Sequence, residues 1–466
     1  MNDPEVSGLL TVQQAIAVID GTAVAPRVVR VRLENAAGLR LAEDLVADRD
    51  YPPFLKSLMD GYAVRRADVA QAPADLLVVG EIAAGAWPQR AIDAGETMAI
   101  MTGAPLPAGA DGVVPVEDVE QRGAVGQSVR VLRAAAPDRY VAATGSDCPA
   151  GRVVLQRGAM MGPAQIAVAA SVGAAEISAY ARPRVAVLGT GDELVPVAQS
   201  PGPAQIRNSN TPMLVAQLRA MGCEVTDLGA VRDDPALIRE ALARGMQHDA
   251  LFVTGGMSMG EYDYVPKLLG EMGVLLKITK LKIKPGKPFV FGMLEREEGR
   301  GQGEGDCKMQ IANCKMQIEG TDAATPSAPA APQFEISNLQ FAICNPPSFV
   351  FGLPGNPVAA FVCTVRLASR LLARMAGGEP AERWVSGRLS EGLPANGPRE
   401  FYQPAVRTVA PGKHSMQSEF AEVRPLAWKG SADLFTLAAA NVLLVRAAGE
   451  SAAGKGAVVR VLEIGC

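Results

Sequence analysis

Histidine is nearly absent from this sequence, which contains only His248 and His414. A histidine-based metal site and a Ser-His-Asp catalytic arrangement both depend on this residue, so both are poor explanations of any activity. We expect the two histidines to be ordinary surface residues. Aromatic residues make up only 5% of the chain, which leaves few rings on which nucleic-acid bases could stack. Any chemistry therefore depends on carboxylates, lysines, arginines and backbone amides.

Excess positive charge, long apolar runs and regularly spaced cysteines are missing as well. The net charge of −4 argues against a protein that neutralises many nucleic-acid phosphates. The chain has no run of about 18 apolar residues and no basic N-terminal segment leading into an apolar core, so neither a membrane span nor a secretory signal is predicted. The seven cysteines are scattered and odd in number, as in a reducing compartment. The expected location is the cytoplasm.

The length of 466 residues predicts three or four domains, at roughly 100–200 residues per domain. Changes in sequence pattern divide the chain into a discontinuous N-terminal or linker domain of mixed structure, a β-rich domain, an α/β domain and a C-terminal β-domain. Their expected residues are 8–51 with 148–180, 52–147, 181–376, and 380–466, respectively. The predicted fold class is a multidomain combination of α/β and β-rich modules.

Three segments have a clear local prediction. Residues 8–22 read as a short helix with Thr11 as its N-cap. Residues 28–51 mix short strands with a helix-like stretch. Residues 357–376 form one long apolar helix.

The α/β domain is predicted from apolar strands that alternate with amphipathic helices. This alternation favours a mostly parallel sheet with helices on both faces, whose ligands gather at the carboxyl ends of the strands. Three loops are expected at that edge, at residues 189–193, 228–234 and 254–263.

Residues 296–347 differ in composition from the domain around them. They are rich in Gly and Glu and then in Ala, Pro and Ser, and the sequence CKMQI occurs twice. This composition predicts a disordered insertion. Because similar FVFG segments flank it, we expect it to leave the tip of a hairpin, where added chain length has a small entropic cost.

Two loops at the expected sheet edge suit an anion. Each follows a buried strand and is rich in glycine, so backbone N–H groups can close on phosphate oxygens. A tight turn with no ligand is an equally simple reading of either loop alone. The residues concerned are Gly189, Thr190, Gly191, Gly255, Gly256, Ser258 and Gly260.

Carboxylates accompany these loops, and a turn with two lysines follows them. Carboxylate oxygens are the ligands that Mg²⁺ prefers, and a rigid pair of ammonium groups suits an oxyanion. Asp234 is expected to cap the helix that begins at Pro235, which leaves Asp233 for a metal. The other residues singled out are Asp192, Glu193, Asp263, Lys284, Lys287 and Pro288.

Taken together, these segments resemble the molybdopterin molybdenumtransferase family, which includes the second catalytic domain of gephyrin. The match follows one order along nearly the whole chain outside the insertion. The matching segments are SLMDGYAVR (57–65), MTGAPLPAGADGVVPVED (101–118), LGTGDEL (188–194), VRDDP (231–235), TGGMSMGEYDY (254–264), KIKPGKPFVFG (282–292) and GLPGNPV (352–358).

The resemblance implies a central molybdopterin-binding α/β domain, two β-rich modules, and a homodimer whose active site lies between subunits. It implies adenylylated molybdopterin and molybdate as substrates, Mg²⁺ as cofactor and AMP as product. It also gives Asp60 and Thr102 a catalytic role, beside Glu193 and Asp263, and adds Arg399 and Ser431 to the oxyanion site. Mg²⁺ would be held by Glu193, Asp233 and Asp263, with Asp192 as an alternative.

Several questions stay open at this level. Some relatives have Ser after the LPGNPV segment, where this chain has Ala359. Loss of one neutral hydrogen bond there would weaken oxyanion binding by about 1 kcal/mol. The alternative functions are a non-catalytic scaffold of the same fold and an enzyme that inserts tungstate. A molybdopterin adenylyltransferase is a candidate partner, whereas nucleic acid and membranes are not expected.

Overall fold

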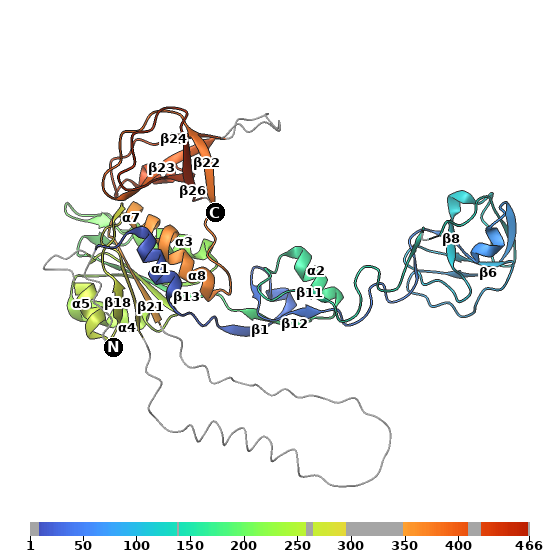
Figure 1. The fold of residues 1–466 in the computed structure, drawn as a ribbon. Coiled ribbons are helices and arrows are strands. Elements are labelled where there is room, and N and C mark those ends of the chain that lie inside the picture. The colour runs from blue at the N-terminus through green and yellow to red at the C-terminus, as the bar shows by residue number, and fades with distance from the viewer. Residues whose placement is uncertain (1–8, 138, 258–263, 295–347, 409–420, 465–466) are drawn as a thin grey trace, which may run out of the picture. The chain divides into compact units, whose positions relative to one another are not determined.

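The computed structural model describes residues 9–137, 139–257, 264–294, 348–408 and 421–464 (Figure 1). These residues form two compact units. The smaller unit is Val28–Tyr180, and the larger unit consists of the described residues on either side of it. The insertion predicted at 296–347 lies outside the described residues.

A six-stranded sheet forms the centre of the larger unit. Four neighbouring strands of this sheet pair in parallel, and the two at one side are joined by antiparallel pairings, so five of the six strands run in one direction. The expected mostly parallel sheet is confirmed. In spatial order the strands are β16 (Glu224–Val231), β13 (Arg184–Thr190), β17 (Ala250–Thr254), β21 (Ser348–Leu353), β20 (Val290–Leu294) and β18 (Leu275–Ile278).

The register of the parallel strands aligns their carboxyl ends. Thr190 pairs with Val231, Gly189 pairs with Thr254, and Thr254 pairs with Leu353. The loops that follow these strands therefore begin at one edge of the sheet, which is the edge where parallel α/β sheets bind ligands.

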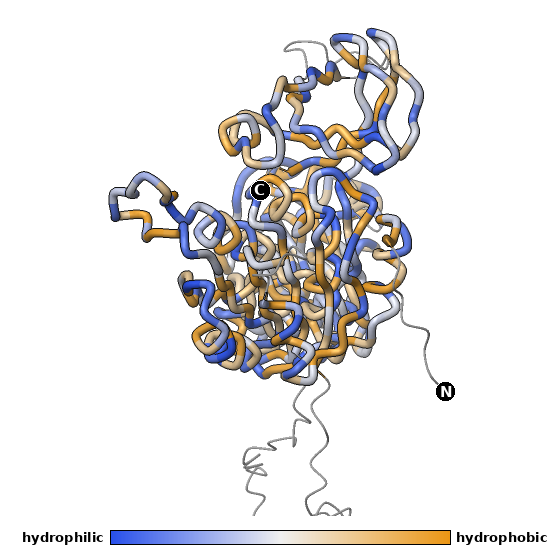
Figure 2. The backbone as a smooth tube through the Cα atoms, turned by 90° about the vertical axis from the view of Figure 1, so that its left-hand side faces the viewer, coloured by the Kyte–Doolittle hydropathy of each residue, from blue (hydrophilic) through white to orange (hydrophobic). Residues whose placement is uncertain are grey.

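Helices cover both faces of this sheet, and each face has its own apolar core. Figure 2 shows hydrophobic stretches of the chain gathered inside the larger unit. One face carries α1 (Val12–Gly21), α3 (Asn210–Ala220), α7 (Pro357–Cys363) and α8 (Ser369–Met375). The other carries α4 (Pro235–Gly245) and α5 (Tyr264–Glu271).

The helix expected at 357–376 is interrupted in the structure. A π-helical turn, η4 (Thr364–Ala368), separates α7 from α8. The apolar pattern predicted one continuous helix because a π turn changes the helical register without introducing Pro or Gly.

Helix α1 forms where the sequence predicts a helix, but it belongs to a different unit from the one expected. Thr11 caps it, and Gln14 completes a capping box. Its buried residues Val12, Ala15 and Ile19 belong to the core beneath the α/β sheet. The segment 8–51, which was expected to form one discontinuous domain with 148–180, is therefore divided between the two units.

A ring of β-strands completes the larger unit. β25 pairs with both β26 and β23, so five strands close on themselves, and the two-residue strand β19 adds to β23. These strands are β19 (Ile283–Lys284), β22 (Trp384–Leu389), β23 (Glu400–Thr408), β24 (Glu422–Pro425), β25 (Val442–Arg446) and β26 (Val458–Glu463). Outside the ring, the larger unit also contains α9 (Leu434–Ala438), β14 (Leu194–Val195) and β15 (Ile206–Arg207).

The smaller unit is built mainly of short strands. A five-stranded sheet comprises β8 (Gly112–Pro115), β5 (Gly61–Val64), β7 (Glu96–Ile100), β6 (Ala74–Ile82) and β9 (Ser128–Val131). The remaining elements are β1 (Val28–Arg32), β2 (Arg40–Leu41), β3 (Leu45–Val46), β4 (Lys56–Ser57), β10 (Val141–Ala142), β11 (Val153–Leu155), β12 (Glu176–Tyr180) and α2 (Pro163–Ser171). The helix-like stretch expected within 28–51 is only a three-residue 3₁₀ turn, Leu33–Asn35.

The two histidines were expected to lie on the surface. His248 is half-buried, with its ring nitrogens 3.2 Å from the Gly245 carbonyl and 3.1 Å from the Thr226 hydroxyl. It therefore joins the end of α4 to β16. His414 lies outside the described residues.

Candidate functional site

The glycine loop after β17 lies directly against the end of β13. Gly255 has a φ of +95°, and a Cβ at this position would lie 2.2 Å from the carbonyl oxygen of Thr190. No side chain fits there, so only glycine permits this approach. The hydroxyl of Thr190 is buried and has no hydrogen-bond partner among the described residues. The loop thus presents bare backbone at the ligand-binding edge.

Acidic side chains come from the two loops that follow β13 and β16. The amide of Gly191 donates to the carbonyl of Val231, which joins these loops at 3.1 Å. Oδ1 of Asp192 lies 3.3 Å from the backbone nitrogen of Asp233 and 3.3 Å from Nε of Arg232. The Asp192–Arg232 ion pair is exposed and contributes little to stability.

Glu193 folds back over its own loop. Its carboxylate oxygens lie 2.7 and 2.9 Å from the position that a Cβ would take on Gly191. Glu193 and Asp233 therefore come from adjoining loops of one sheet edge and supply oxygen ligands of the kind Mg²⁺ takes.

The third expected metal ligand, Asp263, lies outside the described residues, as do Ser258 and Gly260. Within the residues that the structure describes, no three His, Cys, Asp or Glu side chains form a group able to hold a metal ion. The donor set is chemically suited to Mg²⁺, and two of its three proposed members are described.

Asn210, which the sequence analysis did not single out, joins the loops at this edge. Its Nδ2 donates to the hydroxyl of Thr254 at 2.9 Å and to the carbonyl of Gly355 at 2.6 Å. The Thr254 hydroxyl in turn donates to the carbonyl of Pro354. An Asn at the first turn of a helix that faces the strand ends was the available sequence signal.

The next loop connects this edge to the C-terminal strands. Asn356 donates its Nδ2 hydrogen to Oγ of Ser431 at 2.8 Å, and the amide of Val358 donates to the carbonyl of Ser431 at 3.0 Å. Ser431 is thus fixed beside the start of α7. Its hydroxyl hydrogen remains able to donate to another acceptor.

The two-lysine turn packs against the C-terminal end of α7. Gly286 has a φ of +122°, and a Cβ there would lie 2.6 Å from Sγ of Cys363, the last residue of α7. Lys284 and Lys287 are exposed, while Pro288 is half-buried. The turn is therefore packed closely on its inner side, and its two ammonium groups lie on the accessible side.

Strand pairing brings the lysine turn next to Arg399. In the parallel pair of β19 and β23, Ile283 is opposite Glu400, and Lys284 is opposite Phe401. The Nζ of Lys284 lies 4.7 Å from the centroid of the Phe401 ring, a cation–π distance. Arg399 directly precedes this strand. The sequence analysis did not identify Phe401, which contacts one of the predicted site residues.

In the smaller unit, Asp60 and Thr102 are direct partners. Oδ1 of Asp60 accepts hydrogen bonds from the backbone nitrogen and the hydroxyl of Thr102, each at 2.7 Å. The backbone hydrogen bond first, and then the hydroxyl hydrogen bond, lower the pKa of Asp60 below its usual value. Its carboxylate is therefore ionised at neutral pH.

The structure thus brings the described site residues of the larger unit to one sheet edge and to the adjoining turn on β19. The links between them are the Thr190–Gly255 contact, the Asn210 and Asn356 hydrogen bonds, and α7. Asp60 and Thr102 are together in the smaller unit.

This fold and this arrangement of residues define a multidomain protein whose α/β domain binds its ligand at the carboxyl ends of parallel strands. A family model described as the MoeA N-terminal region (domain I and II) matches residues 10–173. A second, described as a probable molybdopterin binding domain, matches residues 186–374.

Curated relatives match across most of the chain. The molybdopterin molybdenumtransferase of Nostoc sp. is 30% identical over 93% of this chain and 88% of its own length. The enzyme of the same name from Haemophilus influenzae is 32% identical over 74% of this chain and 72% of its own. The crystal structure of a molybdopterin biosynthesis MoeA protein from Pyrococcus horikoshii covers 98% of this chain and 100% of its own, with 25% identity and a TM-score of 0.76.

The chain therefore belongs to the molybdopterin molybdenumtransferase family and is a transferase of molybdenum cofactor biosynthesis. The predicted family, fold class and molybdenum-inserting activity are confirmed. Among the described residues, no helix is long and apolar enough to cross a lipid bilayer.

Proposed function

We propose that this protein inserts molybdate into adenylylated molybdopterin, with cleavage of the pyrophosphate link and release of AMP. The observation that carries the proposal is the continuity between a phosphate-type loop region and a cationic turn. Asn210 ties Gly355 to the strand ends, and Asn356 ties the same loop to Ser431. A diphosphate ester and an oxyanion can therefore lie side by side.

The glycine loops would bind the pyrophosphate. Gly255 and Gly256 are only half-buried and carry no side chain, so their N–H groups can approach phosphate oxygens. Gly189 and Gly191 are buried, and the Gly191 amide already donates to Val231, so these two would shape the loop. The buried hydroxyl of Thr190 lies beneath this loop region and would be able to donate to a phosphate oxygen, since no described residue accepts its hydrogen. Ser258 and Gly260 belong to the same proposed cradle but lie outside the described residues.

Glu193, Asp233 and Asp263 would hold Mg²⁺, and Asp192 is the alternative ligand. When bound, the ion would neutralise negative charge on the pyrophosphate and so favour departure of AMP. Arg232 already pairs with Asp192, so Asp192 is kept as the alternative ligand.

Lys284, Lys287, Arg399 and Ser431 would bind the molybdate dianion, with Pro288 as the rigid shoulder of the turn. Charge-assisted hydrogen bonds from ammonium and guanidinium groups are the strongest that side chains make to an oxyanion. Ser431 accepts its hydrogen bond from Asn356, so its own hydrogen can point to the bound anion.

Asp60 and Thr102 would complete the active site from the smaller unit of a second subunit. Ionised Asp60 would orient a reacting group or take up its proton, with Thr102 holding its carboxylate. The protein would therefore act as a homodimer. We further propose a cytoplasmic location and substrate supply by a molybdopterin adenylyltransferase.

The test is incubation of the purified chain with adenylylated molybdopterin, Mg²⁺ and molybdate, followed by measurement of AMP. Molybdate-dependent AMP release and transfer of active cofactor to an apo-molybdoenzyme are expected. Lys287→Ala should reduce the rate at low molybdate by at least about ten-fold, because it removes a charge-assisted hydrogen bond. Lys282→Ala, an exposed lysine on the same segment, is the control.

The outcome also separates the alternatives. If tungstate supported AMP release better than molybdate, the protein would be a tungstate-inserting enzyme. No AMP release with either oxyanion would contradict the proposal and favour a scaffold.

A further inference from the structure

Arg366 is a buried cation within the long helical segment that follows the LPGNP loop. It is 4% exposed and lies in the π turn η4, between α7 and α8. A buried guanidinium is tolerated only when its charge and hydrogen bonds are matched. Single π turns within helices are frequent near functional sites.

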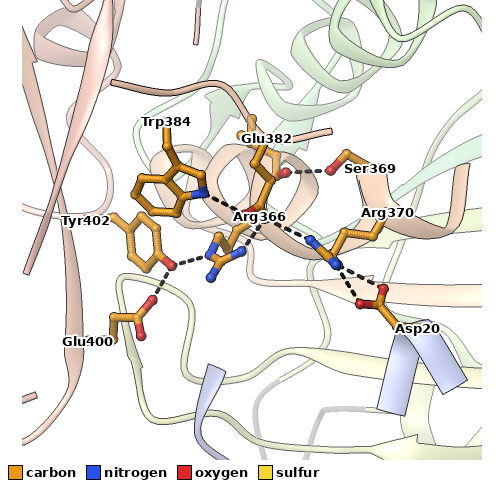
Figure 3. Close-up of polar contacts among 9 residues, drawn as sticks. Asp20, Arg366, Ser369, Arg370, Glu382, Trp384, Glu400 and Tyr402 are labelled. Carbon is orange, nitrogen blue, oxygen red and sulfur yellow. Dashed lines mark hydrogen bonds and ion pairs between the residues drawn. The ribbon is translucent and has the colours of Figure 1, made fainter. Parts of the chain in front are cut away.

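The partners of Arg366 come mainly from the C-terminal strands, as Figure 3 shows. Its Nε donates to the hydroxyl oxygen of Tyr402 at 2.7 Å. Its guanidinium also pairs with Glu382 and lies over the ring of Trp384, 5.4 Å from the centroid. Arg366 therefore fastens the helix to β23.

Tyr402 uses its hydroxyl in both directions. It accepts from Arg366 and donates to the carboxylate of Glu400, two residues earlier on the same strand. The side chain of Tyr402 is fully buried, and burial raises the pKa of its phenol well above the ordinary value. The hydroxyl therefore keeps the hydrogen that it donates to Glu400.

The opposite face of β23 belongs to the oxyanion site. Successive side chains of a strand point to opposite faces, so Arg399 and Phe401 alternate with Glu400 and Tyr402. Phe401 contacts Nζ of Lys284 and stacks on Trp428, with ring centroids 5.8 Å apart. Glu400 and Arg366 instead line a cleft of about 770 Å³ with residues of α1 and β26.

Helix α7, at the start of this helical segment, contacts the proposed oxyanion site in two places. Val358 in the first turn of α7 donates to Ser431, and Cys363 at the end of α7 lies under Gly286. The helix thus carries contacts to Ser431 and the lysine turn, and Arg366 adds the third contact, to β23. These three contacts would fix the oxyanion-binding groups relative to one another.

We infer that Arg366 and Tyr402 are positioning residues for the oxyanion site, which hold β23 so that Arg399 and Phe401 lie beside Lys284. The inference rests on the proposed function of this turn in binding molybdate. Neither residue belongs to the groups proposed to touch the anion. The Tyr402 side chain lies on the face of β23 opposite to Arg399 and Phe401, and Arg366 bonds to it there.

The test compares Tyr402→Phe with Arg370→Gln. The first removes only the hydroxyl that joins Arg366 to β23. Arg370 lies one helical turn later, and its ion pairs are with Asp20 and with Glu382, which it shares with Arg366. Arg370→Gln therefore serves as the control, because it removes partly buried polar contacts of the same helical segment.

Direct binding of molybdate is measured by equilibrium dialysis of the full chain, alongside the melting temperature and the KM for each substrate. For Tyr402→Phe we expect molybdate binding to weaken about ten-fold, the effect of losing roughly one well-placed hydrogen bond. The KM for adenylylated molybdopterin should stay within about two-fold of wild type. Arg370→Gln should lower the melting temperature without changing the molybdate Kd.

Equal molybdate Kd values for wild type and Tyr402→Phe would overturn the inference and leave the proposed function intact. Absence of molybdate binding by wild type would instead overturn the proposed function, and the inference with it. If Tyr402→Phe does not fold, Glu400→Gln provides the test, since it keeps the shape but removes the charge that holds the Tyr402 hydroxyl. A smaller weakening of molybdate binding is expected, and an unchanged Kd would again overturn the inference.

Discussion

Asp60 and Thr102 are joined by two hydrogen bonds to a single carboxylate oxygen, although 42 residues separate them in the sequence. One donor is the backbone nitrogen of Thr102, and the other is its hydroxyl. The carboxylate is therefore held in one orientation and stabilised in its ionised form. A single oxygen with two short hydrogen bonds leaves the second oxygen, Oδ2, as the one that would act on a substrate.

Thr102→Val tests this pair through its pH dependence. The change removes the hydroxyl hydrogen bond but keeps the backbone one, so the pKa of Asp60 should rise toward its ordinary value. The acidic limb of the kcat/KM profile should move to higher pH, and the loss of activity relative to wild type should be largest below about pH 4, near the ordinary pKa of an aspartate. Thr102→Ser keeps the hydroxyl and should retain the wild-type profile.

The same pair makes a prediction about stability. Because the folded pKa of Asp60 is lowered, its stabilising effect is present above the unfolded pKa and is lost as pH falls through the folded value. The difference in melting temperature between wild type and Thr102→Val should therefore be largest near neutral pH. A difference that instead grew in acid would contradict the assignment.

Asp233 and Asp234 are adjacent acids with different expected roles. Asp234 accepts hydrogen bonds from the amides of Ala236 and Leu237 and caps α4, as the sequence predicts. Asp234→Ala should lower the free energy of unfolding by about 1 kcal/mol with little effect on kcat at saturating Mg²⁺. Asp233→Ala should instead lower kcat, with little effect on the free energy of unfolding. Denaturant unfolding and AMP release measured on both variants check this, and exchanged results would refute the assignment.

Gly286 is a position where the packing leaves no space for a side chain. Gly286→Ala would place a Cβ 2.6 Å from Sγ of Cys363 and force a strained φ of +122°. The turn should distort, and molybdate binding should weaken by at least about ten-fold, which corresponds to 1.4 kcal/mol. Adding Cys363→Ala removes the steric contact but not the strain, so the double variant should recover part of the binding. Equilibrium dialysis of both variants gives the answer, and wild-type binding by Gly286→Ala would be the contrary result.

Removal of the metal is expected to abolish AMP release. Treatment with a chelator should stop the reaction, and excess Mg²⁺ should restore it. Glu193→Gln should raise the Mg²⁺ concentration for half-maximal rate by about ten-fold or more, because an amide is a poorer ligand than a carboxylate. Glu224→Gln, which removes an exposed carboxylate at the amino end of β16, should leave that concentration unchanged. The Mg²⁺ dependence of the rate distinguishes these outcomes.

Features that depend on residues close to one another in the sequence could be predicted from the sequence. The Thr11 cap, the Asp234 cap and the parallel order of the α/β strands were all predicted, and the structure confirms them. Two local predictions were wrong. The helix at 357–376 contains a π turn, and the helix-like stretch in 28–51 is almost entirely strand and turn. In both, apolar spacing alone did not determine the backbone.

By itself, the sequence determined which chemical groups the site offers, because glycine loops, acids and paired lysines follow identifiable strands. The tertiary structure decided which of these groups meet. Contacts between Thr190 and Gly255, Lys284 and Phe401, and Arg366 and Tyr402 join residues far apart in the chain. Such contacts arise from strand register and from the matching of buried polar groups, and neither leaves a periodic pattern in the sequence.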